Sequence, residues 1–318
     1  MVIELHVEPG MVYKWRKFRE EKPAYSIALD GIVNSPTRRD LNGPYANFDH
    51  HAGSGFDTRS TSDQVHMEIK MGLFQTFRKD GVPYAHVFVN NHDEDVCLSF
   101  WELQNNELIS SGSNPSINRL VYCEDRLDCT SGAYPFGDIA MRRKMAWVFQ
   151  PYNMSRFEGR LKEATADDMK RIIETVGGRI TEHISGGGGG EIDLEGHFVR
   201  IGGDDNWAFT RETGPASRMA MYNNGISAFV ALVSEGSDGS FVYSIGKRSP
   251  WISYFDLLQF YRRLNKEEGK IITKLNKWGG TDTRGGSPRA TGSFIRPTRV
   301  EEIIASEVRK KLSLGHFQ

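Results

Sequence analysis

Asp49, His50 and His51 follow one another directly, after a short apolar segment and before a glycine-containing stretch. Asp30 precedes them by 19 residues, and the acidic sequence HDED occupies 92–95. Carboxylates gathered in one place repel one another unless a cation neutralises them. Aspartate and histidine are donors that Mn²⁺, Mg²⁺ and Zn²⁺ accept, and this mixture favours manganese. The candidate metal ligands are Asp30, Asp49, His50, Asp93 and Asp95.

This number of acids is enough for two ions, with one carboxylate bridging them. A water held by both ions would lose its proton near neutral pH and attack a phosphorus atom, while the ions offset the developing negative charge. The residue types therefore predict metal-dependent hydrolysis of a phosphoester.

The candidates follow apolar runs of the kind that form buried strands. The runs at 24–33, 44–51 and 85–95 each deliver acidic residues at their C-terminal ends. The polar sequence STSD at 60–63 predicts the start of a helix, which we expect to end near Gly81. This order of strands and helix predicts a mostly parallel α/β sheet, whose ligands lie beyond the carboxyl ends of its strands. The three acidic ends should therefore share one edge of the sheet.

The middle of the chain predicts a helix followed by a run of glycines. The helix covers 165–176 and begins with a capping box from Thr165 to Asp168. The glycine run within 184–193 has two readings, a flexible joint between domains or a backbone nest that binds phosphate.

Beyond about residue 196 the sequence pattern changes and predicts short strands separated by turns. An amphipathic helix is predicted at 251–269, and a glycine-rich basic loop occupies 278–295. The whole is an α/β chain, with a mostly parallel sheet in the N-terminal domain and a smaller mixed α/β C-terminal domain. The expected domains are 1–183 and 196–318, joined by a linker at 184–195.

Composition narrows the class of protein. The 318 residues include 40 basic and 41 acidic side chains, so the net charge of −1 does not indicate a general polycation for nucleic acid. No apolar run approaches the roughly 18 residues of a membrane span, and the first residues do not resemble a signal peptide. The three cysteines are too few and too scattered for a disulfide framework, which favours a cytoplasmic protein without a membrane partner.

The sequence from 24 to 51 resembles the second and third motifs of the DHH phosphoesterase superfamily. It has a strand-end Asp, a short loop with Pro and Arg, and then Asp-His-His, and TSDQV at 61–65 is similar to the start of the family's next helix. The segments 240–264 and 284–295 resemble the associated C-terminal substrate-binding domain. The resemblance covers roughly residues 24 to 295.

The resemblance implies a role for each matching residue. Asp30 would bridge two metal ions, His50 would bind a metal, His51 would face the phosphate, and Asp49 would orient a neighbour or bind metal. Asp49 and His51 are thus the candidate catalytic residues, and Asp93 and Asp95 would complete the metal shell. The candidate substrate ligands are Arg38, Arg248, Arg284, Gly285, Gly286, Ser287 and Arg289, with Lys247 beside them. Ser287 stands where the family usually has His, and a serine binds phosphate without carrying charge.

One family motif does not stand in its usual place. A strand ending in His with an Asp-x-Asp pair normally precedes the position of Asp30, and here the pair is Asp93-Glu94-Asp95. Either this pair occupies the place of the fourth motif and one metal site is impaired, or it replaces the first motif in a rearranged order. The second case needs a further acid, and the segment 122–138 offers Asp125, Asp128 and Asp138. We choose Asp128, whose alternative role is to cap a turn.

The remaining histidines and Arg38 can be interpreted without a role in the metal site. We expect His66, His86, His183, His197 and His316 to be surface or packing residues. Arg38 either reaches a phosphate or lies in a solvated loop.

The function predicted is hydrolysis of a nucleotide or short oligonucleotide by a metal-activated water, with two Mn²⁺ ions or with Mg²⁺ or Zn²⁺. One alternative is a catalytically impaired relative that binds a nucleotide or a partner protein, and the other is a pyrophosphatase or polyphosphatase. The sequence leaves a homodimer open.

Overall fold

The computed structural model describes residues 2–40, 43–51, 59–130, 132, 134, 136–161, 163–186, 189–194, 197–214, 216–273 and 276–315. The chain forms two compact units. Unit 1 contains residues 1–129, 136–152 and 164–193, and unit 2 contains 130–135, 153–163 and 194–318. Two short segments that precede residue 164 thus belong to unit 2, and the division into two domains at 184–195 stays a prediction.

Unit 1 is built on a mostly parallel sheet, as the sequence predicts. The strand order is β1-β6-β2-β4-β3. The pairs β1/β6, β6/β2 and β2/β4 are parallel, whereas β3 pairs antiparallel with β4, and β5 pairs antiparallel with β6. The strands are β1 (Val2–Val7), β2 (Ser26–Leu29), β3 (Arg38–Asp40), β4 (Tyr45–Phe48), β5 (Arg78–Lys79) and β6 (Val82–Val89).

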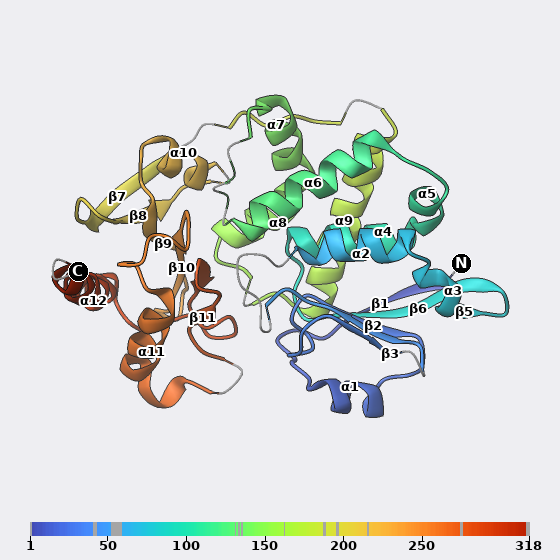
Figure 1. Cartoon of the computed structure of the whole chain (residues 1–318), viewed down its shortest axis with the longest axis horizontal. Helices are drawn as coiled ribbons and strands as arrows, with labels where there is room; N and C mark the ends of the chain where they lie inside the picture. The colour runs from blue at the N-terminus through green and yellow to red at the C-terminus, as the bar shows by residue number, and fades with distance from the viewer. Residues whose placement is uncertain are drawn as a thin grey trace. The chain divides into compact units, whose positions relative to one another are not determined.

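Helices cover both faces of this sheet (Figure 1). Neighbouring residues of β6 point to opposite faces, so Val87 joins a large core and Phe88 a smaller one. In the larger core the sheet packs against α2 and α4, and in the smaller core it packs against Phe18 of α1. The helices of this part of the chain are α1 (Trp15–Glu21), α2 (Thr61–Lys70), α3 (Leu73–Thr76), α4 (Glu94–Gln104), α5 (Asn106–Ser110), α6 (Pro115–Cys129), α7 (Ile139–Val148), α8 (Gln150–Phe157) and α9 (Ala166–Ile184). Helix α8 extends from unit 1 into unit 2 at residue 153.

The ends of two helices test the sequence predictions. Ser60 caps α2 by accepting the N–H of Asp63, as predicted. The predicted end near Gly81 is wrong, because Gly72 adopts φ +90° after α2 has ended at Lys70, and α3 and β5 follow. The capping box between Thr165 and Asp168 is confirmed, and α9 continues to Ile184.

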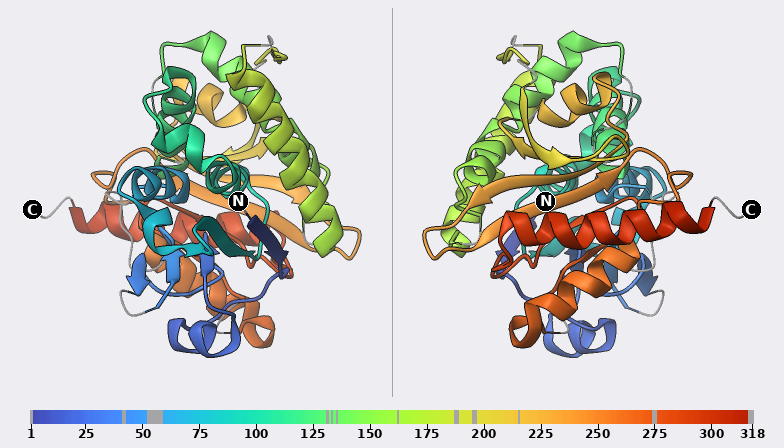
Figure 2. Two further views of the ribbon diagram at one scale, coloured as in Figure 1. Left: turned by 90° about the vertical axis from the view of Figure 1, so that its right-hand side faces the viewer. Right: turned by 90° about the vertical axis from the view of Figure 1, so that its left-hand side faces the viewer.

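Unit 2 holds a mixed sheet in the order β11-β12-β10-β9-β8-β7. Its neighbours are antiparallel except for the parallel pair β8/β9. Helices α11 and α12 run side by side along it (Figure 2) and share a core with Trp207, Phe255 and Trp278. The elements are β7 (Phe198–Gly203), β8 (Ala208–Glu212), α10 (Ser217–Asn223), β9 (Ala228–Glu235), β10 (Phe241–Lys247), α11 (Leu257–Glu268), the 3₁₀ turn η1 (Gly269–Ile271), β11 (Gly279–Gly280), β12 (Arg284–Gly286) and α12 (Pro297–Gly315).

Part of the glycine run packs closely against unit 1. A Cβ added to Gly190 would stand 2.3 Å from the Trp147 ring, so only glycine fits there. The N–H of Ile192 donates to the carbonyl of Arg143 at 3.2 Å. These contacts hold the end of the run on α7, while Gly187, Gly188, Glu195 and Gly196 lie outside the described residues.

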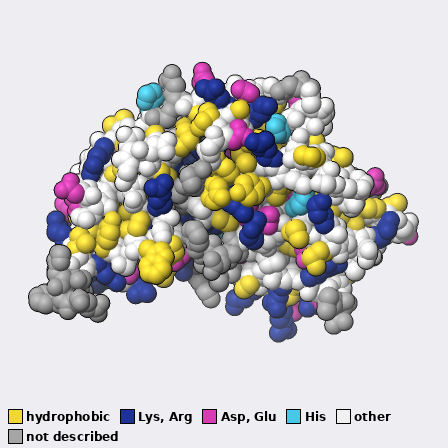
Figure 3. Space-filling model, turned by 45° about the horizontal axis from the view of Figure 1, so that its top comes forward, with side chains coloured by type: hydrophobic (Ala, Val, Ile, Leu, Met, Phe, Trp, Pro, Cys, Tyr) yellow, Lys and Arg dark blue, Asp and Glu magenta, His cyan; other side chains and the backbone are white. Residues whose placement is uncertain are grey.

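The surface is mixed in charge. Lys and Arg side chains are interspersed with acidic and neutral ones on the face shown in Figure 3, in keeping with the net charge of −1. Within the described ranges, no helix is both long and apolar enough to cross a membrane.

Candidate metal centre

The parallel sheet brings the predicted residues to one edge. Because β6, β2 and β4 are parallel, their carboxyl ends meet on the same side. Asp30 follows β2, and its N–H donates to the carbonyl of Phe48, the last residue of β4, at 2.9 Å. Asp30 has φ +48°, a conformation that few residues other than glycine, asparagine and aspartate adopt readily. The fold therefore turns the chain sharply at the point where it delivers this carboxylate.

Asp30 lies against both histidines of the DHH sequence. Its Oδ1 is 3.3 Å from Nε2 of His50 and 3.2 Å from Nδ1 of His51. Thr61, at the start of α2, donates its hydroxyl to the same oxygen at 3.2 Å. Asp30 and His50 are 1% and 2% exposed, so this contact is almost fully buried. Asp30, His50 and His51 form one group with the spacing of metal ligands.

His50 also belongs to a second group. Its Nδ1 is 3.2 Å from Oδ2 of Asp128, and the thiol of Cys129 completes this group. Both residues come from the last turn of α6. The acid chosen from the sequence, Asp128, therefore lies beside the DHH histidine.

Asp95 joins the centre from the first turn of α4. Its oxygens accept the N–H groups of Thr61 and Ser62, both at 2.7 Å, and one lies 3.8 Å from Nε2 of His50. Asp93 has a different place, because it caps α4 by accepting the N–H of Val96 and also accepts a hydrogen bond from Asn91. Of the predicted acidic pair, only Asp95 contacts the described part of the centre.

Asp49 orients its neighbour His51. Its Oδ1 accepts the backbone N–H of His51 at 2.9 Å and lies 3.0 Å from the ring Nδ1. The hydroxyl of Thr37 donates to the carbonyl of Asp49 and holds the loop. The side chain of His51 is 33% exposed, whereas that of His50 is 2% exposed, so His51 is the more accessible of the two rings.

Burial and close charges shift the pKa values in the centre. Burial raises the pKa of Asp30, but the imidazoles of His51 and His50 outweigh it and hold this pKa well below its usual value. Burial lowers the pKa of His51, yet Asp30 and Asp49 raise it to about 8. For His50, Asp128 and Asp30 likewise overcome burial and raise the pKa well above its usual value. Burial, with Asp128 and Asp30 nearby, raises the pKa of Asp95 to about 6.

These shifts describe a site of buried negative charge. The raised pKa values of His50 and His51 favour protonated rings beside the carboxylates, and a cation would compensate the same negative charge while displacing those protons. The described clusters of acidic and histidine side chains can therefore hold a metal ion.

The predicted substrate ligands are spread over both units. Arg38 is exposed on β3 of unit 1, with its guanidinium 5.4 Å from the Trp15 ring centre, and the others lie in unit 2. Arg248 and Arg289 are exposed, whereas the buried Lys247 donates to the carbonyl of Ile252.

The Gly285-Gly286-Ser287 sequence has a structural task. A Cβ on Gly285 would lie 2.1 Å from the Tyr261 hydroxyl, and one on Gly286 would lie 2.4 Å from the Tyr243 carbonyl. The Ser287 hydroxyl accepts the N–H of Tyr243 at 3.0 Å. Close packing of β12 against its neighbours explains these residues, and their role as phosphate ligands, with that of Arg284, stays a prediction.

Sequence reasoning missed one member of the centre. Cys129 was set aside with the other cysteines, although its position directly after Asp128 was the available signal. Asp125 accepts hydrogen bonds from the backbone N–H of Ser60 and the Nε–H of Arg59, and so anchors the start of α2.

Comparison of the chain with family models and with curated proteins finds no match.

Proposed function

We propose that the chain is a metal-dependent phosphoesterase of the DHH type that hydrolyses a nucleotide or a short oligonucleotide. The observation that carries the proposal is the buried contact of Asp30 with both His50 and His51. The segments that follow two neighbouring parallel strands, β2 and β4, supply this contact, so the pairing of these strands sets the positions of the donors. We also propose that the protein acts in the cytoplasm.

The donor set fits a divalent cation of hard to borderline character. Carboxylate oxygens and imidazole nitrogens of Asp30, His50, Asp95 and Asp128 would hold it. The family resemblance implies that Asp30 would serve two ions. The mixture favours Mn²⁺, and Zn²⁺ or Mg²⁺ are the alternatives. The ion supplies an ionised water and offsets negative charge on the phosphoryl oxygens.

The chain's own residues would do the remaining work. His51 is partly accessible and can hold a proton on its ring, for transfer to the oxygen that leaves the phosphorus atom. Asp49 fixes the orientation of that ring through Nδ1. The buried walls around Asp30 keep bulk water from competing for the carboxylates. The arginines predicted from the sequence would bind phosphate oxygens by charge-assisted hydrogen bonds.

The test is a hydrolysis panel with Mn²⁺ present. The substrates are short oligonucleotides, cyclic dinucleotides, phosphoadenosine phosphate and pyrophosphate. We expect turnover of at least one nucleotide substrate, lost in Asp30→Asn and kept in Glu107→Gln, which changes an exposed carboxylate on α5. Turnover of pyrophosphate alone would favour the pyrophosphatase alternative, and equal turnover by both variants would refute the assignment of the site.

One observation favours a second candidate, a nucleotide-binding protein without hydrolytic activity. Asp93 caps a helix, which leaves fewer carboxylates for a second ion. Equilibrium dialysis decides between the two: nucleotide bound without metal and without turnover selects the binding protein, whereas two bound Mn²⁺ ions per chain select the enzyme.

A further inference from the structure

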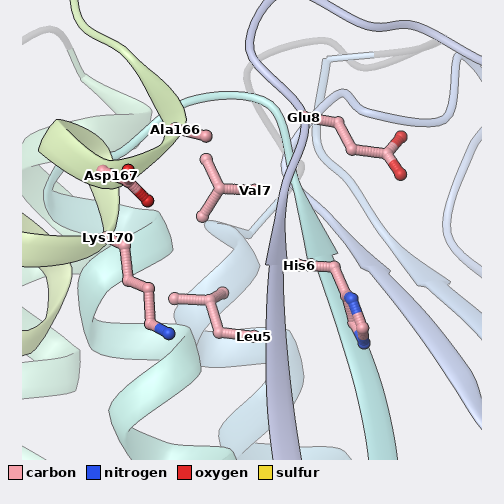
Figure 4. A pocket seen from close by; sticks show the side chains of 7 residues that line it. All are labelled: Leu5, His6, Val7, Glu8, Ala166, Asp167 and Lys170. Carbon is pink, nitrogen blue, oxygen red and sulfur yellow. The ribbon is translucent and has the colours of Figure 1, made fainter.

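Three donor side chains also meet on the far face of the same sheet, away from α9. Glu4 and His6 stand on β1, and His86 stands opposite Glu4 on the parallel neighbour β6. Figure 4 shows His6 on the face of β1 opposite to Leu5, which points toward α9. The sheet pairing alone brings these residues together, since His6 and His86 are 80 residues apart.

The spacing of the donor atoms matches the ligands of a tetrahedral zinc ion. Nε2 of His6 is 3.1 Å from Nδ1 of His86, which is 2.9 Å from Oε2 of Glu4. The third distance, from His6 Nε2 to the same Glu4 oxygen, is 3.8 Å. Zinc bonds of about 2.0–2.1 Å at tetrahedral angles place ligand atoms about 3.3 Å apart, within the observed range.

Neighbouring residues hold both rings in position. The Tyr84 hydroxyl lies 2.9 Å from Nε2 of His86, so a proton on Nε2 can be donated to it while Nδ1 keeps its lone pair toward the cluster. The His6 ring stacks on Phe88 with ring centres 4.6 Å apart. A hydrogen bond to the second ring nitrogen is the usual support of a metal-binding histidine.

The cluster is open on one side. The side chains of Glu4 and His6 are 48% and 38% exposed, whereas that of His86 is 14% exposed. An ion can therefore enter from solvent, and water can occupy the fourth position of the tetrahedron.

We infer that Glu4, His6 and His86 form a zinc site separate from the candidate metal centre. Two imidazoles and a carboxylate are a donor set that zinc accepts. The bound ion would link β1 to β6, and these two strands are neighbours in the described sheet. Because the site exists only when the strands are paired, zinc binding stabilises the folded state. The inference does not depend on the proposed function.

The test measures zinc bound per chain by competition with a chromophoric chelator. The full chain is compared with His86→Ala and Glu4→Gln, and with His183→Ala on α9 as a matched control. We expect both cluster variants to bind one zinc ion fewer per chain, and the control to bind as many as the parent. Circular dichroism verifies that each variant is folded, and Glu4→Gln changes a side chain that is 48% exposed while keeping its size.

Tyr84→Phe separates a metal site from a packing role. It keeps all three donors and removes the oxygen beside Nε2, so we expect zinc affinity at this site to fall about 10- to 100-fold. Equal zinc content in the parent and in folded Glu4→Gln or His86→Ala would overturn the inference.

Discussion

Nε2 of His50 lies 3.3 Å from Oδ1 of Asp30, and both side chains are buried. The two residues follow neighbouring parallel strands, β4 and β2, whose register pairs Phe48 with Leu29. The contact is therefore set by the pairing of these two strands, and the predictions on Asp30 and His51 depend on it.

Replacing Asp30 tests the candidate metal centre without disturbing the backbone. Asparagine tolerates the positive φ of this position, so Asp30→Asn should fold normally while losing the negative charge. We expect bound Mn²⁺ to fall and hydrolysis to be lost. Asp30→Ala adds backbone strain of about 1 kcal/mol, and the difference in melting temperature between the two variants measures that strain.

His51 should act on the chemical step rather than on metal binding. We expect His51→Gln to lower kcat by about 10²- to 10⁴-fold, the range for loss of a general acid or base. Metal content and KM should change little, because the buried His50 remains. A His51→Gln variant with the parent kcat would remove this residue from the mechanism.

The buried carboxylate of Glu212 should make the stability of unit 2 sensitive to acid. It is buried between Arg156 and Arg218, at 2.7 Å from each. Burial raises the pKa of Glu212, but the two guanidinium groups outweigh it and lower this pKa below its usual value. A lowered folded-state pKa gives stability that is present above the unfolded pKa of about 4.3 and is lost as the pH falls through the folded pKa.

The variant Glu212→Gln isolates this contribution. It removes the carboxylate that neutralises two partly buried arginines, so the free energy of unfolding at pH 7 should fall by about 3 kcal/mol. The difference from the parent should shrink below about pH 4. Glu235→Gln, which breaks the exposed pair with Arg211, is the matched control and should change stability by less than about 1 kcal/mol. Equal effects of the two substitutions in denaturant titrations would contradict the prediction.

Gly285 tests whether the glycine-rich loop is structural. A Cβ there would meet the Tyr261 hydroxyl at 2.1 Å and the Gly279 carbonyl at 2.3 Å. Gly285→Ala should therefore lower the free energy of unfolding by about 1–3 kcal/mol, the usual cost of an overpacked core, and the melting temperature should fall with it. Gly214→Ala, where a Cβ would meet nothing within 4 Å, should be neutral or slightly stabilising. A stable Gly285→Ala variant would leave phosphate binding as the reason for glycine.

The sequence predicted what depends on local order. Apolar runs ending in Asp30 and Asp49 are strands with acidic ends, and the capping box of Thr165 is read directly from residue spacing. The early end of α2 was missed, because helical periodicity continues past Gly72 while its φ of +90° does not.

The order in which the strands pair, and the contacts that follow from this order, could not be predicted. The meeting of His6 with His86 requires the knowledge that β1 lies beside β6. In the same way, the acidic pair at 93 and 95 divides into a helix cap and a residue of the centre only when α4 is positioned on the sheet.

Anomalous X-ray diffraction from crystals grown with Mn²⁺ tests the central claim most directly. We predict an anomalous peak within bonding distance of Asp30 Oδ1 and His50 Nε2, absent in Asp30→Asn crystals. Crystals at saturating Mn²⁺ with no peak there, and with His50 still hydrogen-bonded to Asp30, would contradict the account.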